Sequence, residues 1–269
     1  MVTGRRLAPR ADRERLPVSD ERSDVVSSPY PPIRGFIENT LIDWEGKIAC
    51  EVFLPTCNLR CPFCHAGHLL TDSGELESIP VEAVLDCLER HKGWIDGVVI
   101  SGGEPTLHPS LGAMMELFRS HGAGIKLDSN GTHPEVIEDL LSRGLIDAIS
   151  MDLKTALDER YFAAAGTTCD LDAIRRSIQL IMASDIEYEF RTTVCPAYIT
   201  RADLLDIAQA IPGARKYILQ QFRPDDCLDP AMNEVKPYSR ETLREFAEAV
   251  REHVPSCIVR GDWAGPSGS

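Results

Sequence analysis

Short apolar runs alternate with helical patterns along most of the chain, and this alternation constrains the fold more than any other feature. The runs are rich in Val, Ile and Leu, and each is followed by a turn and then a helical pattern. We expect strands at 48–54, 97–100, 124–127, 148–152, 188–194 and 217–221 and helices at 81–91, 110–120, 134–142, 172–183, 201–210 and 239–253. Such repeated units predict an α/β fold with a parallel sheet and outer helices, either an open doubly wound sheet or an incomplete barrel.

Unusual polar groups follow the expected strands and help to choose between these two folds. They lie at 56–64, 101–105, 128–131, 152–154, 191–193 and 220–223. Active sites lie at the C-terminal rim of α/β barrels and at the equivalent edge of open sheets. Because six separate strands contribute to one site, we expect a curved sheet and predict an incomplete (β/α)6 barrel with parallel strands.

The 269 residues fit one catalytic domain with a tail. Residues 1–34 combine several arginines with acidic residues, serine and proline and show no hydrophobic period, so we expect a flexible N-terminal extension. We predict that the barrel domain spans 35–261 and that 262–269 form a C-terminal tail. The expected helix at 134–142 has proline in its first turn and Gly144 just past its end, which is typical of a helix.

Charge and hydropathy exclude several kinds of partner. The 42 acidic and 28 basic residues give a net charge of −14, which repels phosphate backbones, so we expect no nucleic-acid partner. No stretch approaches the ~20 apolar residues of a membrane span, so we expect no membrane partner. The first 24 residues contain no apolar segment like that of a secretory signal, and we expect a cytoplasmic protein.

The nine cysteines fall into two groups. In a reducing cytosol, an odd number of cysteines indicates metal binding or catalysis before disulfides. Cys57, Cys61 and Cys64 stand at Cys-x3-Cys-x2-Cys spacing on a loop after the first strand, which lets three thiolates wrap around one iron–sulfur centre. We expect the six isolated cysteines to be small buried hydrophobic residues: Cys50, Cys87, Cys169, Cys195, Cys227 and Cys257.

Three ligands with no obvious fourth favour a four-iron four-sulfur cluster that leaves one iron open. Zinc normally takes four protein ligands in a structural site and three in a catalytic one. His65 or His68 would therefore have to complete a closed zinc site, and His65 is awkwardly adjacent to Cys64. Unligated thiols are the third interpretation.

The cysteine spacing resembles the signature of the radical S-adenosylmethionine (radical SAM) superfamily, whose members usually have an aromatic residue at the position of Phe63. The resemblance covers about 35–261. It implies that the open iron chelates the amino and carboxylate groups of SAM. It also implies that one electron from the reduced cluster releases a deoxyadenosyl radical, with the protein orienting and shielding the chemistry.

A glycine-rich segment after the second expected strand extends this resemblance. Ser101 precedes Gly102, Gly103 and Glu104, which match the GGEP segment of the family. In the family, the backbone and the carboxylate of this segment hold the ammonium group of SAM. The chemistry agrees, because glycines let a ligand approach the backbone and a carboxylate pairs with a cation. A purely structural turn is the alternative.

Two more segments are similar to those of activating enzymes for glycyl-radical proteins. Asp128 and Asn130 belong to an Asp-Ser-Asn-Gly segment in which serine replaces the threonine of the family, and Asp152 and Lys154 form an Asp-x-Lys segment. The resemblance implies that both segments border SAM and that the aspartates help to hold a monovalent cation. Arg191 would point into the rim and pair with the carboxylate or ribose of SAM. An Asn-Gly turn and a strand-end salt bridge are the structural alternatives.

Longer stretches, including 41–47, 97–107 and 219–224, look like the anaerobic ribonucleoside-triphosphate reductase activating proteins. This resemblance implies a glycyl-radical enzyme as partner, a reduced flavodoxin or ferredoxin-type electron donor and, without further cysteine runs, a single cluster. Three alternatives remain. They are a radical SAM enzyme that acts on a small molecule, an iron–sulfur electron carrier and a zinc-stabilised binding module.

Overall fold

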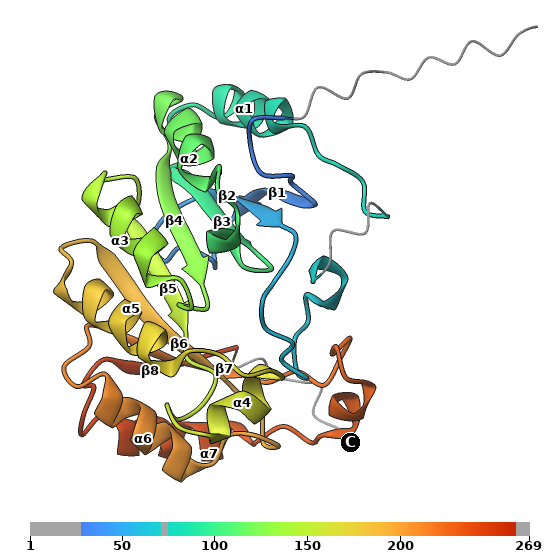
Figure 1. Ribbon diagram of the computed structural model, residues 1–269. Helices are drawn as coiled ribbons and strands as arrows, with labels where there is room; N and C mark the ends of the chain where they lie inside the picture. The colour runs from blue at the N-terminus through green and yellow to red at the C-terminus, as the bar shows by residue number, and fades with distance from the viewer. Residues whose placement is uncertain (1–27, 71–74, 262–269) are drawn as a thin grey trace, which may run out of the picture.

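The computed structural model describes residues 28–70 and 75–261. Its centre is an eight-stranded sheet whose strands stand in chain order (Figure 1). The strands are β1 (Gly35–Thr40), β2 (Ala49–Leu54), β3 (Gly97–Gly102), β4 (Gly124–Ser129), β5 (Ala148–Asp152), β6 (Glu187–Val194), β7 (Tyr217–Gln221) and β8 (Cys257–Arg260). The α-helices are α1 (Val81–Arg90), α2 (Leu111–Ser120), α3 (Pro134–Ser142), α4 (Arg160–Ala165), α5 (Leu171–Ala183), α6 (Arg201–Ala210) and α7 (Arg240–Val250). Short 3-10 helices are η1 (Gly67–Leu69), η2 (Pro105–Leu107) and η3 (Pro230–Glu234).

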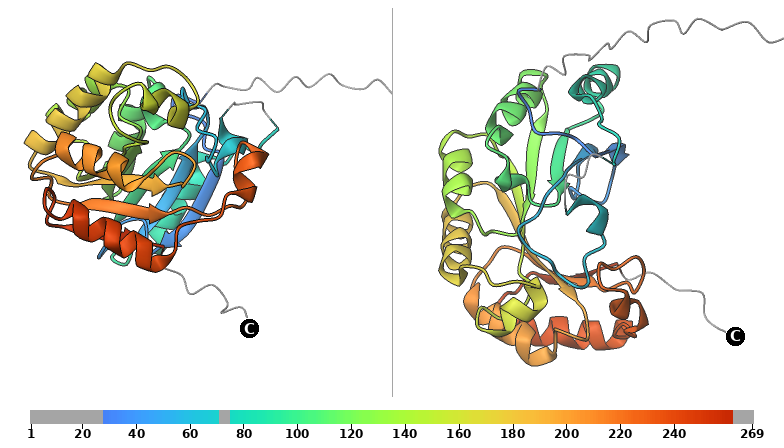
Figure 2. Two further views of the ribbon diagram at one scale, coloured as in Figure 1. Left: turned by 90° about the horizontal axis from the view of Figure 1, so that it is seen from below. Right: turned by 45° about the vertical axis from the view of Figure 1, so that its right-hand side comes forward.

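The sheet is a partial barrel. β1 pairs with β2 in antiparallel fashion, and every later neighbour pair is parallel. Within the described ranges no pairing joins β1 to β8, so the barrel is not closed. Figure 2 shows the curved sheet with helices along its outer side. The six expected strands are β2 to β7, which confirms the predicted incomplete α/β barrel, and β1 and β8 extend it at the two edges.

Local sequence signals explain where several helices begin. α3 starts at Pro134, and Gly144 follows its end with a φ of +61°, as the sequence predicted. At the start of α6, Thr200 and Asp203 form a capping box in which each side chain accepts a hydrogen bond from the backbone of the other. These signals fix the helix ends, and the burial of an apolar face holds the helices against the sheet.

The two faces of the sheet differ in chemistry. Ile100 and Leu127 point outward and are fully buried with Met114 and Phe118 of α2 in the main hydrophobic core. Because side chains alternate along a strand, the residues between them face the concave side, the lumen of the barrel. Beside a small apolar cluster that includes Val99 and Ala148, many of the buried residues there are polar or charged: Glu51, Lys126, Asp128, Ser150 and Glu189. Branched aliphatic residues dominate the lumen of a closed α/β barrel, so this lumen is unusually charged.

Most of the predicted extension lies outside the described residues, as does the predicted tail at 262–269. Of 1–34, residues 28–34 are described, and Ile33 is buried and forms a β-bridge with Ile79. Five of the six isolated cysteines are buried as expected, whereas Cys169 is partly exposed. All nine cysteines lie in the described ranges, and none forms a disulfide. No helix within 28–70 or 75–261 has both the length and the apolar character needed to span a bilayer.

Candidate active site

The residues singled out from the sequence line a single cavity of about 370 Å³ at the C-terminal ends of the parallel strands. They are Cys57, Cys61, Phe63, Cys64, Ser101, Gly102, Gly103, Glu104, Asp128, Asn130, Asp152, Lys154 and Arg191. The cavity therefore joins segments that are far apart in the chain, as expected for the rim of an α/β barrel.

The cysteine loop leaves β2 through Thr56, a non-glycine residue with a φ of +67°. Contacts from distant segments then hold the loop. The amide of Arg60 donates to the carbonyl of Ala165, the last residue of α4, at 2.8 Å. Near the third cysteine, the amides of Leu228 and Asp229 each donate at 2.9 Å, to the carbonyls of Cys64 and Pro62 respectively. Two distant parts of the chain thus shape the loop that presents the thiols.

The thiols face the cavity in a partly apolar environment. Burial raises the pKa of the Cys61 thiol to about 11, and burial also raises the pKa of Cys57. The backbone amide of Leu59 donates a hydrogen bond to Cys57 Sγ at 3.4 Å, and the side-chain amide of Asn130 lies 3.9 Å from the same sulfur. Among the described residues, no three His, Cys, Asp or Glu side chains converge in a way that could hold a single metal ion.

Gly102 and Gly103 are required by close backbone contacts. Gly102 has a φ of +121°, and a Cβ atom there would lie 2.3 Å from the carbonyl oxygen of Leu54. At Gly103 a Cβ atom would lie 1.9 Å from the carbonyl oxygen of Thr56. Any side chain would therefore push the end of β3 away from the start of the cysteine loop.

Glu104 ties two loops together. Its carboxylate is buried and accepts hydrogen bonds from the amide and hydroxyl of Thr106, from Ser129 Oγ at 2.8 Å and from the amide of Asn130 at 2.7 Å. Burial raises the pKa of Glu104, and these hydrogen bonds oppose the rise. That this carboxylate also holds an ammonium group stays a prediction, because four protein donors already occupy it.

The Asp-Ser-Asn-Gly segment forms the turn that its Asn-Gly pair predicts, with Gly131 at a φ of +74°. The side-chain amide of Asn130 donates through Nδ2 to Asn58 Oδ1 at 2.9 Å. Asn58 in turn donates to Thr132 Oγ1 at 2.8 Å. The turn after β4 therefore supports the first part of the cysteine loop.

Four charged side chains form the inner wall of the cavity. The guanidinium of Arg191 bridges Asp128 Oδ2 and Asp152 Oδ1, at 2.9 Å from each. Lys154 Nζ lies 3.0 Å from Asp152 Oδ2. Burial alone would raise the pKa of Asp152, but Arg191 and Lys154 lower it well below its usual range. The strand-end salt bridge, which was the structural alternative for Arg191, is therefore present, and it lies inside the cavity.

Several other residues line the cavity although the sequence assigned them no role. Thr193 and Gln220 belong to the polar groups at 191–193 and 220–223, and their position after expected strands could have marked them as lining residues. His65 also lines the cavity, and its Nε2 lies 2.8 Å from the carbonyl oxygen of Arg223. Phe53 lies on β2 among apolar residues, so nothing in the sequence marked it as a lining residue.

The partial barrel and its rim cavity define the class of protein, that of radical SAM enzymes. The family model of the Radical SAM superfamily matches residues 52–211, and the chain belongs to this superfamily. Membership implies a 4Fe-4S cluster and SAM, and the clustered cysteines lie within the matched range.

Individual relatives agree with this assignment. A Methanocaldococcus jannaschii protein that carries the name of a glycyl-radical enzyme activating enzyme is 30% identical over 235 residues, which cover 85% of this chain and 95% of that protein. A mycofactocin maturase of Mycobacterium tuberculosis is 29% identical over 200 residues, 71% of this chain but only 47% of the maturase. The SAM-bound crystal structure of Streptococcus suis SuiB matches 80% of this chain and 51% of SuiB with a TM-score of 0.60. At 14% identity, that structure supports the fold alone.

Proposed function

We propose that this radical SAM enzyme activates a partner glycyl-radical enzyme of the anaerobic ribonucleotide reductase type. The observation that carries the proposal is the cavity at the barrel rim, where the three clustered cysteines meet the glycine-rich segment and the Asp128–Arg191–Asp152 bridge. The Methanocaldococcus jannaschii relative, matched over most of its length, supports the activating subtype.

The residues of the cavity fit the two cofactors that the family implies. Cys57, Cys61 and Cys64 face one space and would hold one cluster, with Phe63 beside the third ligand. The backbone of Gly102 and Gly103, which has no room for side chains, would receive the amino group of SAM. Arg191 and Lys154 are the cations available for its carboxylate and ribose. When bound, the cluster and SAM supply a deoxyadenosyl radical.

A monovalent cation beside Asp128 and Asp152 remains part of the proposal. Asp128 Oδ1 is buried and accepts no hydrogen bond, and Lys126 Nζ lies 3.7 Å from it, so a bound cation would share this oxygen with Lys126. Arg191 already occupies Oδ2 of the same carboxylate. The expected result is that SAM affinity rises when sodium or potassium is added to cation-depleted enzyme, and an unchanged affinity would remove the cation from the proposal.

The size of the cavity supports a substrate that approaches from outside. Sites for drug-sized ligands measure about 300–1,000 Å³, and about 370 Å³ leaves little room beside a cluster and SAM. Below the cavity, buried charged side chains occupy the lumen. A glycine on a partner segment would therefore enter at the rim and lose its Cα hydrogen to the 5′ carbon of the deoxyadenosyl group. The products of that step are 5′-deoxyadenosine and a glycyl radical.

The first test concerns the cofactor chemistry. Anaerobic reconstitution with iron and sulfide, followed by reduction with SAM present, should yield roughly four irons per chain and release deoxyadenosine and methionine. Cys61→Ala should abolish both results, whereas Cys195→Ala should leave both intact because Cys195 is buried away from the cavity. Bound zinc, or a cluster that leaves SAM whole, would favour the binding module or the electron carrier.

The second test concerns the substrate. Reduced enzyme with SAM should produce a glycyl-radical signal in electron paramagnetic resonance when a purified anaerobic reductase is added, with reduced flavodoxin or ferredoxin as electron donor. Deoxyadenosine production that responds only to small molecules would favour the small-molecule enzyme. The electron donor and the cytoplasmic location stay predictions.

A further inference from the structure

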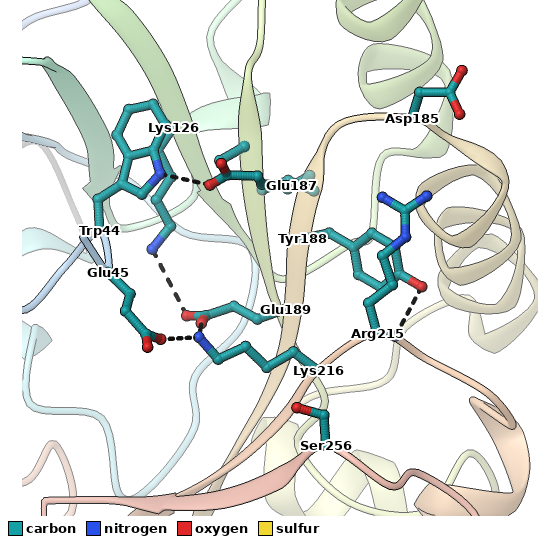
Figure 3. Close-up of a pocket in the computed structure, with 12 residues that line it drawn as sticks. Trp44, Glu45, Lys126, Asp185, Glu187, Tyr188, Glu189, Arg215, Lys216 and Ser256 are labelled. Carbon is teal, nitrogen blue, oxygen red and sulfur yellow. Dashed lines mark hydrogen bonds and ion pairs between the residues drawn. The ribbon is translucent and has the colours of Figure 1, made fainter. Parts of the chain in front are cut away.

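An ion-pair column of alternating charge runs through the lumen, from the floor of the barrel to the candidate site. From floor to site its members are Glu45, Lys216, Glu189, Lys126, Asp128, Arg191, Asp152 and Lys154. Figure 3 shows the lower half, in which the ammonium of Lys216 approaches Glu45 and Glu189, and the ammonium of Lys126 reaches Glu189 from the other side. The column therefore joins the two ends of the barrel through side chains alone.

Lys126 is the member that connects the floor to the site. Its Nζ lies 3.7 Å from Glu189 Oε1 and 3.7 Å from Asp128 Oδ1, and its side chain is only 4% exposed. Lys126 and Glu189 line a floor cavity of about 570 Å³, whereas Asp128 lines the site cavity, and the two cavities share no lining residue. The ion pair between Lys126 and Asp128 thus crosses the boundary between them. Lys126 also donates a hydrogen bond to the carbonyl of Asp43, in the loop between β1 and β2.

The charge on Asp128 Oδ1 is balanced mainly by Lys126. Asp128 Oδ1 is buried without a hydrogen-bond partner, and the ammonium of Lys126 is the cation paired with it. Without Lys126, this buried carboxylate would have only Arg191 to neutralise it, and Arg191 also bridges to Asp152.

We propose that Lys126 is a positioning residue for the SAM site. From below it neutralises Asp128, and Asp128 in turn holds the guanidinium of Arg191 in the orientation that receives SAM. The inference rests on the proposed function, because it requires that Arg191 meets the carboxylate or ribose of SAM. Lys126 lines the floor cavity and not the site cavity, so it would act on SAM only through Asp128.

The test uses the full-length, cluster-loaded enzyme and compares Lys126→Met with Lys126→Arg. Lys126→Met should raise the Kd and the KM for SAM by about tenfold or more, the loss found when a residue that orients a metal ligand is removed. The kcat for deoxyadenosine should change much less, and Lys126→Arg should restore most of the affinity. Iron content and the spectrum of the reduced cluster should match the wild type.

Lys216→Met is the matched control, because Lys216 also pairs with Glu189 but lies one step further from the site. Its Kd for SAM should stay close to that of the wild type. An unchanged Kd in Lys126→Met, or equal losses in both methionine variants, would overturn the proposal. Wild-type enzyme that binds no SAM would instead overturn the proposed function.

A double substitution keeps the test decisive if Lys126→Met alone does not fold. Asp128→Asn combined with Lys126→Met removes both charges of the pair, so no buried charge is left without a partner. If Lys126 acts through Asp128, the double variant should bind SAM as weakly as Asp128→Asn and no more weakly. A further loss of affinity in the double variant would show that Lys126 acts by another route and would overturn the proposal.

Discussion

Replacing Glu51 by glutamine should stabilise the protein, and the gain should grow with pH. Glu51 lies on β2 in the lumen and is only 5% exposed. Burial, together with the neighbouring Asp43 and Asp128, raises the pKa of its carboxyl group to about 8, against an ordinary value of 4.5. Between these two values the unfolded chain has released a proton that the folded protein retains. Stability therefore falls as the pH rises from about 4.5 to about 8 and then levels off.

The size of the effect follows from this difference in pKa. Each pKa unit corresponds to about 1.4 kcal/mol, so the cost of Glu51 is about 3 kcal/mol at pH 7 and at most about 5 kcal/mol above pH 8. Glutamine is close in shape to the protonated acid and cannot ionise. Glu51→Gln should thus gain about 3 kcal/mol at pH 7 and less than about 1 kcal/mol at pH 5.

Urea unfolding of the metal-free protein, followed by circular dichroism at several pH values, measures this gain without a contribution from cluster loss. Glu189→Gln in the same lumen is the matched control with the opposite sign. Burial opposes ionisation of Glu189, but Lys126, Arg260 and Arg191 lower its pKa to about 2. That control should lose about 3 kcal/mol at neutral pH. A gain for Glu51→Gln that is the same at pH 5 and pH 8 would refute the reasoning.

Two further predictions concern the cysteine loop. Because burial raises the pKa of Cys61 to about 11 and also that of Cys57, thiolate ligation releases protons, and iron uptake at limiting iron should increase between about pH 7 and pH 9. Absorption spectroscopy of the reconstituted protein measures this, and uptake independent of pH would contradict it. Gly103→Ala should cost about 3 kcal/mol or more and reduce iron loading, because its Cβ would lie 1.9 Å from the carbonyl oxygen of Thr56. Gly213→Ala, with open space around it and a φ of +75°, should cost only about 1 kcal/mol and load normally.

The central part of the fold could be predicted because β2 to β7 each contain buried apolar residues and are separated by clear helical patterns. The edge strands lacked that signal. β1 is a partly exposed strand in which Ile37 is 43% exposed, and β8 has only four residues. Neither is flanked by neighbours on both sides, so neither needs the continuous apolar sequence of an inner strand.

The candidate site was more predictable than the contacts that support it. Spacing and the family resemblance identified residues at the ends of separate strands, and parallel topology brought them to one cavity. The contacts between side chains in the lumen depend instead on the register in which neighbouring strands pair. Lys126 meets Glu189 only because β4, β5 and β6 pair so that both residues stand on the concave face at neighbouring heights. Sequence periodicity shows that a residue faces inward but not which residue on another strand lies opposite.

The contacts around the cysteine loop have a consequence for the order of events during synthesis. The three cysteines emerge from the ribosome early, whereas Leu228 and Asp229, which hold the carbonyls of Cys64 and Pro62, are made more than 160 residues later. Ala165, which receives the amide of Arg60, also follows about 100 residues after the loop. A nascent chain therefore contains the three cysteines before the residues that hold the cysteine loop have been synthesised. The cysteine loop can bind iron in its final conformation only after β7 and the segment that follows it have been translated and have packed against the loop.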